Sequence, residues 1–344
     1  VFGTGSPVIF YNTTNVGTIA VTPLTIVKVK LQGEILYIIN CGNTTTPAYY
    51  LPAVIATGSS ATFTADVTIN QPTLTNVSSL TGLYVGQALS GTGIPASARI
   101  KVITAPSTIT MGSDDATTVN ATASNNTVTI TRTTLALIMS ATLRSASVGV
   151  MAGYFIELNG RLFVMGADGN VYQSEINDIN TWKADGFFPC NYRPDSGRSV
   201  AKTGNKLIGL CSEHYEILTY TGNPSGSQLS RESTGNIGCG SSVSGQKSVS
   251  YVENYIAFSN PANGIYLFSS EGLKKISIPQ IDDMGLNWSI NTFFIDGSFK
   301  VHAYGPQTTK DFLYDINTRQ WTASGFPSGS IIASSAIQTN LYAV

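Results

Sequence analysis

Short runs of β-branched and aromatic residues, each bounded by Gly, Pro, Asn or Ser, alternate with polar turns along most of the chain. Three of these runs are Leu24–Leu31, Glu34–Ile39 and Arg161–Met165. Such runs are typical of β-strands that end in turns. Few windows extend for ten residues without a helix-breaking residue, so long helices are not expected. The pattern predicts an all-β protein.

A unit of a turn, a short strand, a polar turn and an aromatic-rich strand recurs along the chain. Leu162, Leu207, Ile256 and Val301 occupy equivalent positions in successive units, at spacings of 45, 49 and 45 residues. Four-stranded propeller blades repeat at ~40–50 residues. The repeat therefore predicts a β-propeller.

The segment Thr57–Thr133 interrupts this repeat. It is rich in Thr, Ser, Ala and Val and carries only six charged residues. Without its 77 residues, the 126-residue distance from Leu36 to Leu162 shrinks to 49, which is the blade period again. Loop tips tolerate such insertions, and the alternation in Thr127–Thr131 suits a half-exposed strand. We expect a small β-sandwich inserted into a loop of the first visible blade. The predicted domains are 1–56 as the first part of the propeller, 57–133 as the insert and 134–344 as the remaining blades.

The charge of the chain is sparse and balanced. Charged residues make up 11% of it, with 19 Lys and Arg against 20 Asp and Glu. This balance argues against a polybasic nucleic-acid binder and against an acidic tail protein. Basic residues that stand close together form only pairs or triplets: Lys28 and Lys30; Arg193, Arg198 and Lys202; Lys274 and Lys275. Lys28 and Lys30 fall on one face of a strand, which indicates a solvated sheet face.

The N-terminal residues show no signal peptide. The first residues, Val1–Ser6, lack the basic and apolar regions of a signal peptide. No stretch of ~18 apolar residues exists, so a membrane-spanning helix is not expected. Because the chain starts without Met and stops in an apolar stretch, we expect residues to be missing from one or both ends.

Residues capable of catalysis or metal binding are few and scattered. The two histidines, His214 and His302, are not near a G-x-S-x-G turn, and we expect each at a strand surface or core edge. Gly235–Gly240 resembles a phosphate loop but lacks its Lys-Ser/Thr ending, so a tight turn is expected. The four cysteines form no C-x-x-C pair: Cys41, Cys190, Cys211 and Cys239. We expect them to be buried apolar residues rather than a zinc cage or a disulfide framework.

Several carboxylates lie close together in sequence around a tryptophan, and they are the strongest candidates for a glycosidase pair. These residues are Asp168, Glu175, Asp178 and Asp185, with Trp182 among them. A glycosidase needs two carboxylates that face one sugar. Ser174–Trp182 resembles the Asp-box turn of sialidases only loosely, because its Gly is missing. Asx-type turns beside a Trp packed between blades are the favoured interpretation. The sequence thus predicts no enzyme, no catalytic residue, no cofactor and no metal ligand.

The stretch Gly160–Gly285 resembles the tail-hub, nozzle or packaged-DNA stabilisation proteins of short-tailed bacteriophages, over a little more than a third of the chain. The segments that carry the resemblance occur in order: Leu158–Phe163, Val171–Ser174, Thr181–Trp182, Glu213–Ile217, Tyr220–Asn223, Gly235–Gly240, Gly264–Phe268 and Leu273–Asp282. In addition, Val85–Ala96 is similar to small immunoglobulin-like modules found in many phage structural proteins. That module is not part of the plain hub pattern.

The resemblance implies a structural virion protein, made in the host cytoplasm and located in the phage tail. It implies a homohexameric ring of propellers below the portal and adaptor rings, with fibres or spikes on its outer surface. DNA would pass through the central channel at ejection without specific contacts. Sparse charge suits such a conduit, because each neutralised phosphate adds affinity. Two alternatives remain: a propeller that binds or cleaves host-surface glycans, and a propeller adaptor whose insert serves adhesion.

Overall fold

The structure, a computed structural model, divides into two compact units. One comprises Val1–Met151 and Ser174–Lys183, and the other, here called the four-sheet unit, comprises Ala152–Gln173 and Ala184–Val344. The described residues are 8–11, 14–18, 26–32, 35–41, 48–51, 62–113, 117–140, 142–143, 151–223, 226–240, 248–252, 254–262, 264–284, 288–295, 297–305 and 311–323.

Almost all regular structure in the described ranges is β-strand, as the sequence predicts. The only helix among them is the four-residue α2 (Pro279–Asp282), which has a proline in its first turn. In the ranges that the structure describes, no helix has the length and hydropathy that crossing a membrane requires. The protein is therefore all-β.

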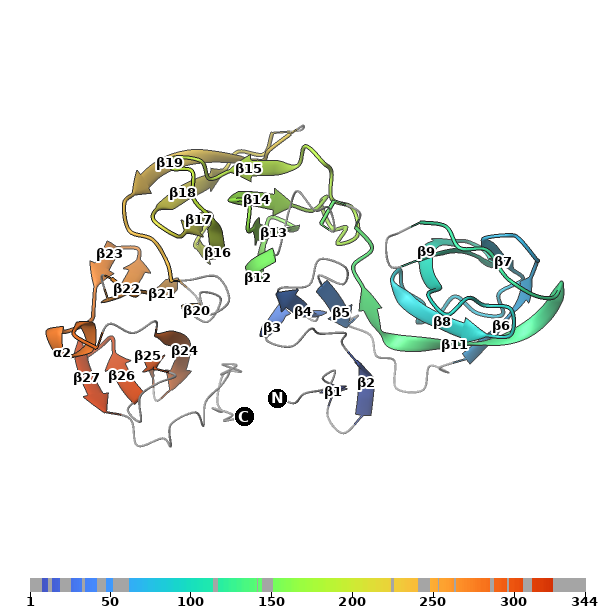
Figure 1. Ribbon diagram of the computed structural model, residues 1–344, viewed down its shortest axis with the longest axis horizontal. Helices are drawn as coiled ribbons and strands as arrows, with labels where there is room; N and C mark the ends of the chain where they lie inside the picture. The colour runs from blue at the N-terminus through green and yellow to red at the C-terminus, as the bar shows by residue number, and fades with distance from the viewer. Residues whose placement is uncertain are drawn as a thin grey trace. The chain divides into compact units, whose positions relative to one another are not determined.

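The four-sheet unit consists of four antiparallel sheets, each formed by four consecutive strands that are paired in chain order (Figure 1). The first and second sheets contain β12 (Met151–Leu158), β13 (Arg161–Gly166), β14 (Asn170–Gln173) and β15 (Phe187–Pro189), then β16 (Gly197–Thr203), β17 (Lys206–Cys211), β18 (Tyr215–Tyr220) and β19 (Leu229–Gly235). The third and fourth sheets contain β20 (Val249–Val252), β21 (Tyr255–Asn260), β22 (Gly264–Ser269) and β23 (Gly272–Lys275), then β24 (Ser289–Ile295), β25 (Ser298–Tyr304), β26 (Asp311–Asp315) and β27 (Gln320–Ala323). Four-stranded meanders in succession are the construction of propeller blades.

The repeat seen in the sequence corresponds to these sheets. Leu162, Leu207, Ile256 and Val301 lie on β13, β17, β21 and β25, which are the second strands of the four sheets. The equivalence of these positions is therefore confirmed. The period of 45 to 49 residues is the length of one sheet with its connection to the next.

Each inner sheet is covered on both faces by its neighbours. Leu207 belongs to the core shared by the first and second sheets, and Ile208, the next residue, belongs to the core shared by the second and third. In the same way, Phe258 faces the second sheet and Ala257 faces the fourth. Side chains alternate along a strand, so a strand between two cores is apolar at successive positions. This packing makes the four sheets one continuous stack.

The other unit contains a nine-stranded sheet, and the first four strands of its hydrogen-bonded order are here called the N-terminal sheet. Its strands are β3 (Ile26–Gln32), β4 (Ile35–Cys41), β5 (Ala48–Leu51) and the end of β11 (Asn126–Leu137), where Ala136 and Leu137 pair with Tyr50 and Tyr49. Leu36 lies on β4, again the second strand. A separate hairpin joins β1 (Val8–Tyr11) to β2 (Thr14–Thr18). The predicted domain boundary at residue 133 falls inside β11, because this strand begins in the insert and ends in the N-terminal sheet.

The insert forms a closed ring of strands rather than two separate sheets. Its strands are β6 (Thr62–Val67), β7 (Thr73–Thr75), β8 (Gln87–Gly91), β9 (Arg99–Thr104), β10 (Thr108–Gly112) and the first part of β11. The hydrogen-bonded order is β11-β6-β7-β10-β9-β8, and β8 pairs with β11 again. Ile130 of β11 faces Phe63 on one neighbour and Gly91 on the other. The predicted two-sheet sandwich is thus replaced by a ring, because the long β11 serves both edges.

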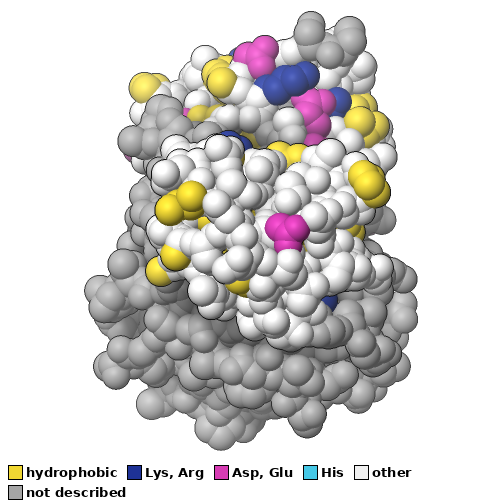
Figure 2. Space-filling model, turned by 90° about the vertical axis from the view of Figure 1, so that its right-hand side faces the viewer, with side chains coloured by type: hydrophobic (Ala, Val, Ile, Leu, Met, Phe, Trp, Pro, Cys, Tyr) yellow, Lys and Arg dark blue, Asp and Glu magenta, His cyan; other side chains and the backbone are white. Residues whose placement is uncertain are grey.

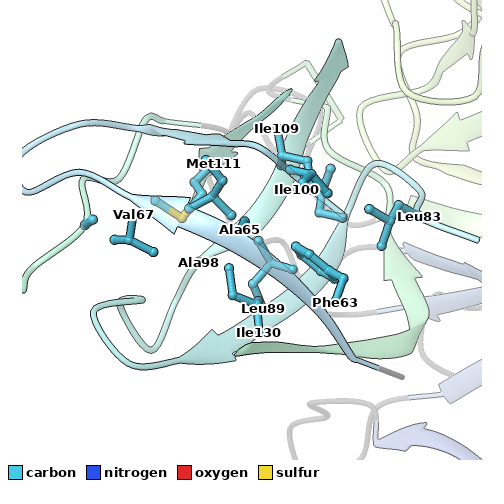
Figure 3. Packing of buried hydrophobic residues seen from close by; sticks show 13 residues of the cluster. Phe63, Ala65, Val67, Leu83, Leu89, Ala98, Ile100, Ile109, Met111 and Ile130 are labelled. Carbon is cyan, nitrogen blue, oxygen red and sulfur yellow. The ribbon is translucent and has the colours of Figure 1, made fainter. Parts of the chain in front are cut away.

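The core of the insert is apolar and lies inside the ring. Phe63, Leu89, Ile100, Ile109 and Ile130 point toward one another from five different strands (Figure 3). The alternating burial along β6 leaves its polar residues on the outside, as a one-sided sheet requires. The insert therefore has a hydrophobic core of its own.

Candidate functional site

A group of charged side chains lies buried at one end of the second sheet and is here called the buried ion cluster. It consists of Asp195, on the connection from β15 to β16, His214, in the turn between β17 and β18, Glu216 of β18, and Arg231 of β19. The side chains of His214 and Glu216 are fully buried and that of Asp195 is 6% exposed, while that of Arg231 is 36% exposed and reaches the cluster from the surface. Charged groups are rarely buried this deeply unless they are paired.

Both ring nitrogens of His214 face a carboxylate. Nδ1 lies 3.0 Å from the carboxylate of Asp195 and Nε2 lies 3.2 Å from Oε1 of Glu216. Backbone amides orient both acids, since Glu213 N–H donates to Asp195 at 2.7 Å and Tyr192 N–H donates to Glu216 at 2.8 Å. The imidazole is consequently fixed in position and orientation.

Arg231 balances the charge of the cluster. Its Nε donates to Oε2 of Glu216 at 2.6 Å and its Nη2 donates to Oε1 at 3.2 Å, which is a forked contact with one carboxylate. Nη2 also donates to Oδ1 of Asn191 at 2.8 Å, and the guanidinium stands over the ring of Phe188 at 5.7 Å. A buried carboxylate left without its partner is costly, so the forked contact with Arg231 offsets part of the cost of burying Glu216.

Two cysteine thiols lie beside this cluster. Cys190 and Cys211 are both buried, and the hydrogen bond between their side chains, together with burial, raises the pKa of Cys190 well above its usual range. Gly209 of β17 allows this packing, because a Cβ there would come within 2.5 Å of the Cys190 sulfur. Ligand atoms of Asp195, Cys211 and His214 all lie within 4.8 Å of one another. Sequence spacing gave no sign of this arrangement.

The remaining cysteine predictions agree with the structure where it describes them. Cys190, Cys211 and Cys239 are buried and are not in disulfides, as expected for small apolar residues. Cys41 lies on β4, and its side chain is outside the described part of the chain. No disulfide joins the three described cysteines.

The carboxylates expected in turns are indeed held there. Oδ1 of Asp168 accepts the amide of Asn170 at 3.0 Å, and Oδ1 of Asp178 accepts the amide of Asn180 at 2.9 Å. Both contacts span two residues, which is the geometry of an Asx turn. Asp168 also accepts the Tyr172 hydroxyl at 2.6 Å; burial first, and then this hydrogen bond, raise the pKa of Tyr172 to about 12.

The other candidates around Trp182 are engaged locally or exposed. Glu175 forms a 2.8 Å ion pair with Lys183, and the Trp182 indole N–H donates to the carbonyl of Ile179 at 2.9 Å. Trp182 is buried and Asp185 is exposed. The Asx-turn interpretation is therefore confirmed for Asp168 and Asp178, and Trp182 is a buried residue.

The glycine-rich segment Gly235–Gly240 connects sheets instead of forming the predicted tight turn. After a bend at Asn236, the amide of Cys239 donates to the carbonyl of Cys211 at 2.8 Å and that of Gly240 donates to Ser259 at 2.9 Å. A Cβ at Gly238 would overlap the carbonyl of Ser212. The amides of Cys239 and Gly240 are thus used within the protein rather than offered to a ligand.

The second histidine is also buried, so the expectation of a strand-surface or core-edge position is wrong for both. His302 of β25 is fully buried, with Nε2 3.3 Å from Oδ2 of Asp311 at the start of β26. Burial lowers the pKa of His302, while the carboxylate of Asp311 opposes this shift. Neither imidazole reaches solvent.

The described basic side chains are scattered or paired. Lys274 forms an ion pair with Glu271, and Lys275 forms one with Asp282 at 2.6 Å. Lys202 donates to the carbonyl of Glu157 at 3.2 Å. Arg193 is exposed and Arg198 is partly buried, while the side chains of Lys28 and Lys30 on β3 lie outside the described part of the chain. The face shown in Figure 2 carries few charged side chains among the described residues.

Sequence reasoning missed the buried ion cluster for a physical reason. Glu216 and Leu218 share the buried face of β18, but Ile217 on the opposite face is apolar too. Period-two alternation therefore gives no sign that a charge points inward. Asp195 meets His214, and Arg231 meets Glu216, only through the fold, over separations of 19 and 15 residues.

Comparisons with known proteins find only distant structural similarities. No family model matches the chain, and no curated protein matches it. Similar solved structures include the dihydro-heme d1 dehydrogenase NirN (10% identity, 80% of this chain and 57% of that one, TM-score 0.36) and BamB from Moraxella catarrhalis (9%, 75% and 66%, TM-score 0.35). The β-propeller domain of Swd1 from Myceliophteria thermophila is also similar (9%, 51% and 50%, TM-score 0.30).

These similarities are too low to carry any argument about activity. The matched region of this chain corresponds to at most 66% of each of those proteins. The architecture described above defines the class: an all-β protein built from successive four-stranded sheets of the propeller type.

Proposed function

We propose that the protein is a structural component of a virion, the hub or nozzle of a short phage tail, which forms a ring around a passage for DNA. The observation that carries the proposal is the unbroken stack of four-stranded sheets in the four-sheet unit. It is supported by the ordered sequence segments that resemble tail-hub proteins. The proposed role is mechanical and requires no catalysis.

Neighbouring sheets of the stack share hydrophobic cores and are also linked by backbone contacts. This packing suits a part of the tail that bears mechanical load. Phe163 and Leu207 lie in one shared core, and backbone hydrogen bonds from Cys239 to Cys211 and from Gly240 to Ser259 tie the connection between the second and third sheets to both of them. Close-packed interiors resist compression. A ring that confines a packaged genome needs such stiffness.

The sparse charge suits a conduit that releases what passes through it. Only 11% of the chain is charged, and two of its lysines, Lys274 and Lys275, are paired with acids. Each phosphate neutralised by a basic side chain adds salt-dependent affinity for DNA, and a ring multiplies this by its copy number. Weak attraction for phosphate lets DNA slide.

The glycan-cleaving alternative has less support from the described residues. Its best carboxylate candidates, Asp168 and Asp178, accept hydrogen bonds within their own turns. The chain has two histidines, His214 and His302, and both are fully buried. A general base must come within hydrogen-bond distance of its substrate, so neither imidazole suits that role toward a bound glycan.

Electron microscopy of the purified protein, together with its mass in solution, tests the proposal. The expected result is a closed ring of several copies with a central opening. A variant in which residues 62–132 are replaced by a short linker retains Ala136 and Leu137 for the N-terminal sheet and is expected to form the same ring. A protein that stays monomeric at high concentration and binds or shortens host polysaccharide would overturn the proposal in favour of the glycan alternative.

A further inference from the structure

Two residues of the buried ion cluster and one neighbouring cysteine bring their ligand atoms close enough together to suggest a metal site. One ligand atom each from Asp195, Cys211 and His214 lies within 4.8 Å of the others. Zinc binds sulfur at ~2.3 Å and nitrogen or oxygen at ~2.0–2.2 Å, so ligands of a tetrahedral ion stand ~3.2–3.8 Å apart. The cluster therefore needs only small adjustments to surround an ion.

The orientation of His214 gives the first independent argument. Glu216 lies 3.2 Å from Nε2 and is itself held by Arg231 and by the amide of Tyr192. When Nε2–H donates to Glu216, the lone pair of Nδ1 faces the carboxylate of Asp195 at 3.0 Å. Two acceptors at that distance in a buried site require a cation between them, either a proton or a metal ion. Metal-ligating histidines commonly donate their other N–H to a carboxylate in this way.

The carboxylate of Asp195 gives the second argument. Its side chain is 94% buried, and although Oδ2 accepts the amide of Glu213, Oδ1 receives no hydrogen bond. A buried acceptor without a donor loses ~1–3 kcal/mol and is uncommon in native proteins. Oδ1 lies on the His214 side of the group, 3.0 Å from Nδ1. A metal ion at this point would satisfy it.

The cysteine ligands indicate which class of metal ion the site would bind. Cys211 is one of the three residues whose ligand atoms lie close together, and its thiol is hydrogen-bonded to that of Cys190. Sulfur ligands select zinc and other soft transition metals over magnesium or calcium. We propose that Asp195, Cys211 and His214 bind a divalent zinc-type ion, and that Cys190, whose thiol contacts that of Cys211 but lies outside the set of mutually close ligand atoms, moves in as the fourth ligand. The thiols lose their protons to solvent when the ion binds.

Such a site would be structural. Cys190 and Asp195 lie on the connection from the first sheet to the second, while Cys211 ends β17 and His214 follows it. The ion would join this connection to the second sheet, with four protein ligands and no open position, as structural zinc sites have. The inference does not depend on the proposed virion role.

Elemental analysis of the full chain, purified without chelator or histidine tag, tests the site. We expect about one zinc ion per chain, and less than a tenth of that in Cys211→Ala. The matched control is Cys239→Ala, which removes another buried thiol from a different core and is expected to keep its zinc. Equal zinc in Cys211→Ala and the wild type would overturn the proposal.

Cobalt substitution provides a readout that does not depend on a variant folding. Adding Co²⁺ to the metal-stripped wild-type chain is expected to produce a thiolate-to-cobalt absorption band and the visible bands of a tetrahedral ion. A folded wild-type chain that contains no metal and gives no thiolate band would overturn the proposal, leaving a proton between His214 and Asp195. A disulfide between Cys190 and Cys211, detected by mass as the loss of two hydrogens, would also overturn it.

Discussion

The hydroxyl of Ser259 donates a 2.7 Å hydrogen bond to the backbone carbonyl of Trp288. Ser259 lies on β21 of the third sheet, and Trp288 immediately precedes β24 of the fourth, so the bond joins two neighbouring sheets. Both residues are almost completely buried, and the indole of Trp288 meets the ring of Phe312 edge-on at 5.7 Å. This polar contact crosses a largely apolar interface, as does the 2.8 Å contact between the hydroxyls of Ser250 and Thr292.

Replacing Ser259 with Ala is expected to lower the free energy of unfolding by ~1–3 kcal/mol, because the buried carbonyl of Trp288 loses its donor. Chemical denaturation of the full chain measures the change. Ser230→Ala, at an exposed position of β19, is the control and is expected to stay within ~0.5 kcal/mol of the wild type. Equal stabilities for the two variants would contradict the interpretation.

Ile109→Ala is expected to destabilise the insert by ~2–5 kcal/mol, because it leaves a cavity in the closed core. Hydrogen exchange followed by mass spectrometry should show faster exchange in peptides from β6 to β10, with no change in peptides from β16 to β27. Val102→Ala, on a half-exposed position of β9, is the control and should leave exchange unaltered. Uniformly faster exchange over the whole chain would show that the insert core is not separate.

Gly238→Ala is expected to destabilise the four-sheet unit by ~1–3 kcal/mol, because the added Cβ overlaps the carbonyl of Ser212. The control is Gly204→Asn, at a position with φ of 55° and no atom near the added Cβ, since Asn tolerates this backbone region. Thermal unfolding of both variants checks the expectation. An unchanged melting temperature in Gly238→Ala would mean that the link between sheets is looser than the structure indicates.

Acidification is expected to destabilise the protein partly through His302. Burial lowers the pKa of this imidazole in the folded chain below the ordinary value of 6.5 that it regains on unfolding. Between these two values the unfolded chain binds more protons, so the free energy of unfolding falls as the pH drops below about 6.5. His302→Gln, measured by denaturation at several pH values, should show a smaller loss over this range. An identical pH dependence would exclude His302 as a contributor.

The sequence predicts the sheets well because their signal is local. Leu162, Leu207, Ile256 and Val301 mark the same strand in four sheets, since each strand must bury apolar side chains and end in a turn. Closure of the insert into a ring was not predictable, because it depends on β11 pairing with two strands that are far apart in sequence. At Gly86, a Cβ would overlap the carbonyl of Leu137, a contact that only the folded chain reveals.

The buried ion cluster escapes prediction for a related reason. His214 and Glu216 are two residues apart, and their pairing could be suspected from the sequence alone. Asp195, Arg231 and Cys190 come from other segments, and nothing local distinguishes them from surface charges or ordinary core cysteines. Electrostatic pairing between distant segments leaves no periodic pattern.

Because β11 begins in the insert and ends as the fourth strand of the N-terminal sheet, the insert is joined to that sheet by a continuous strand and not by a flexible linker. Its last residues complete the sheet from which it emerges, so the two share one rigid backbone segment. A replacement module, whether brought by recombination or by design, must supply an outgoing strand of matching length and register. Only modules whose last strand has this length and register can therefore replace the insert.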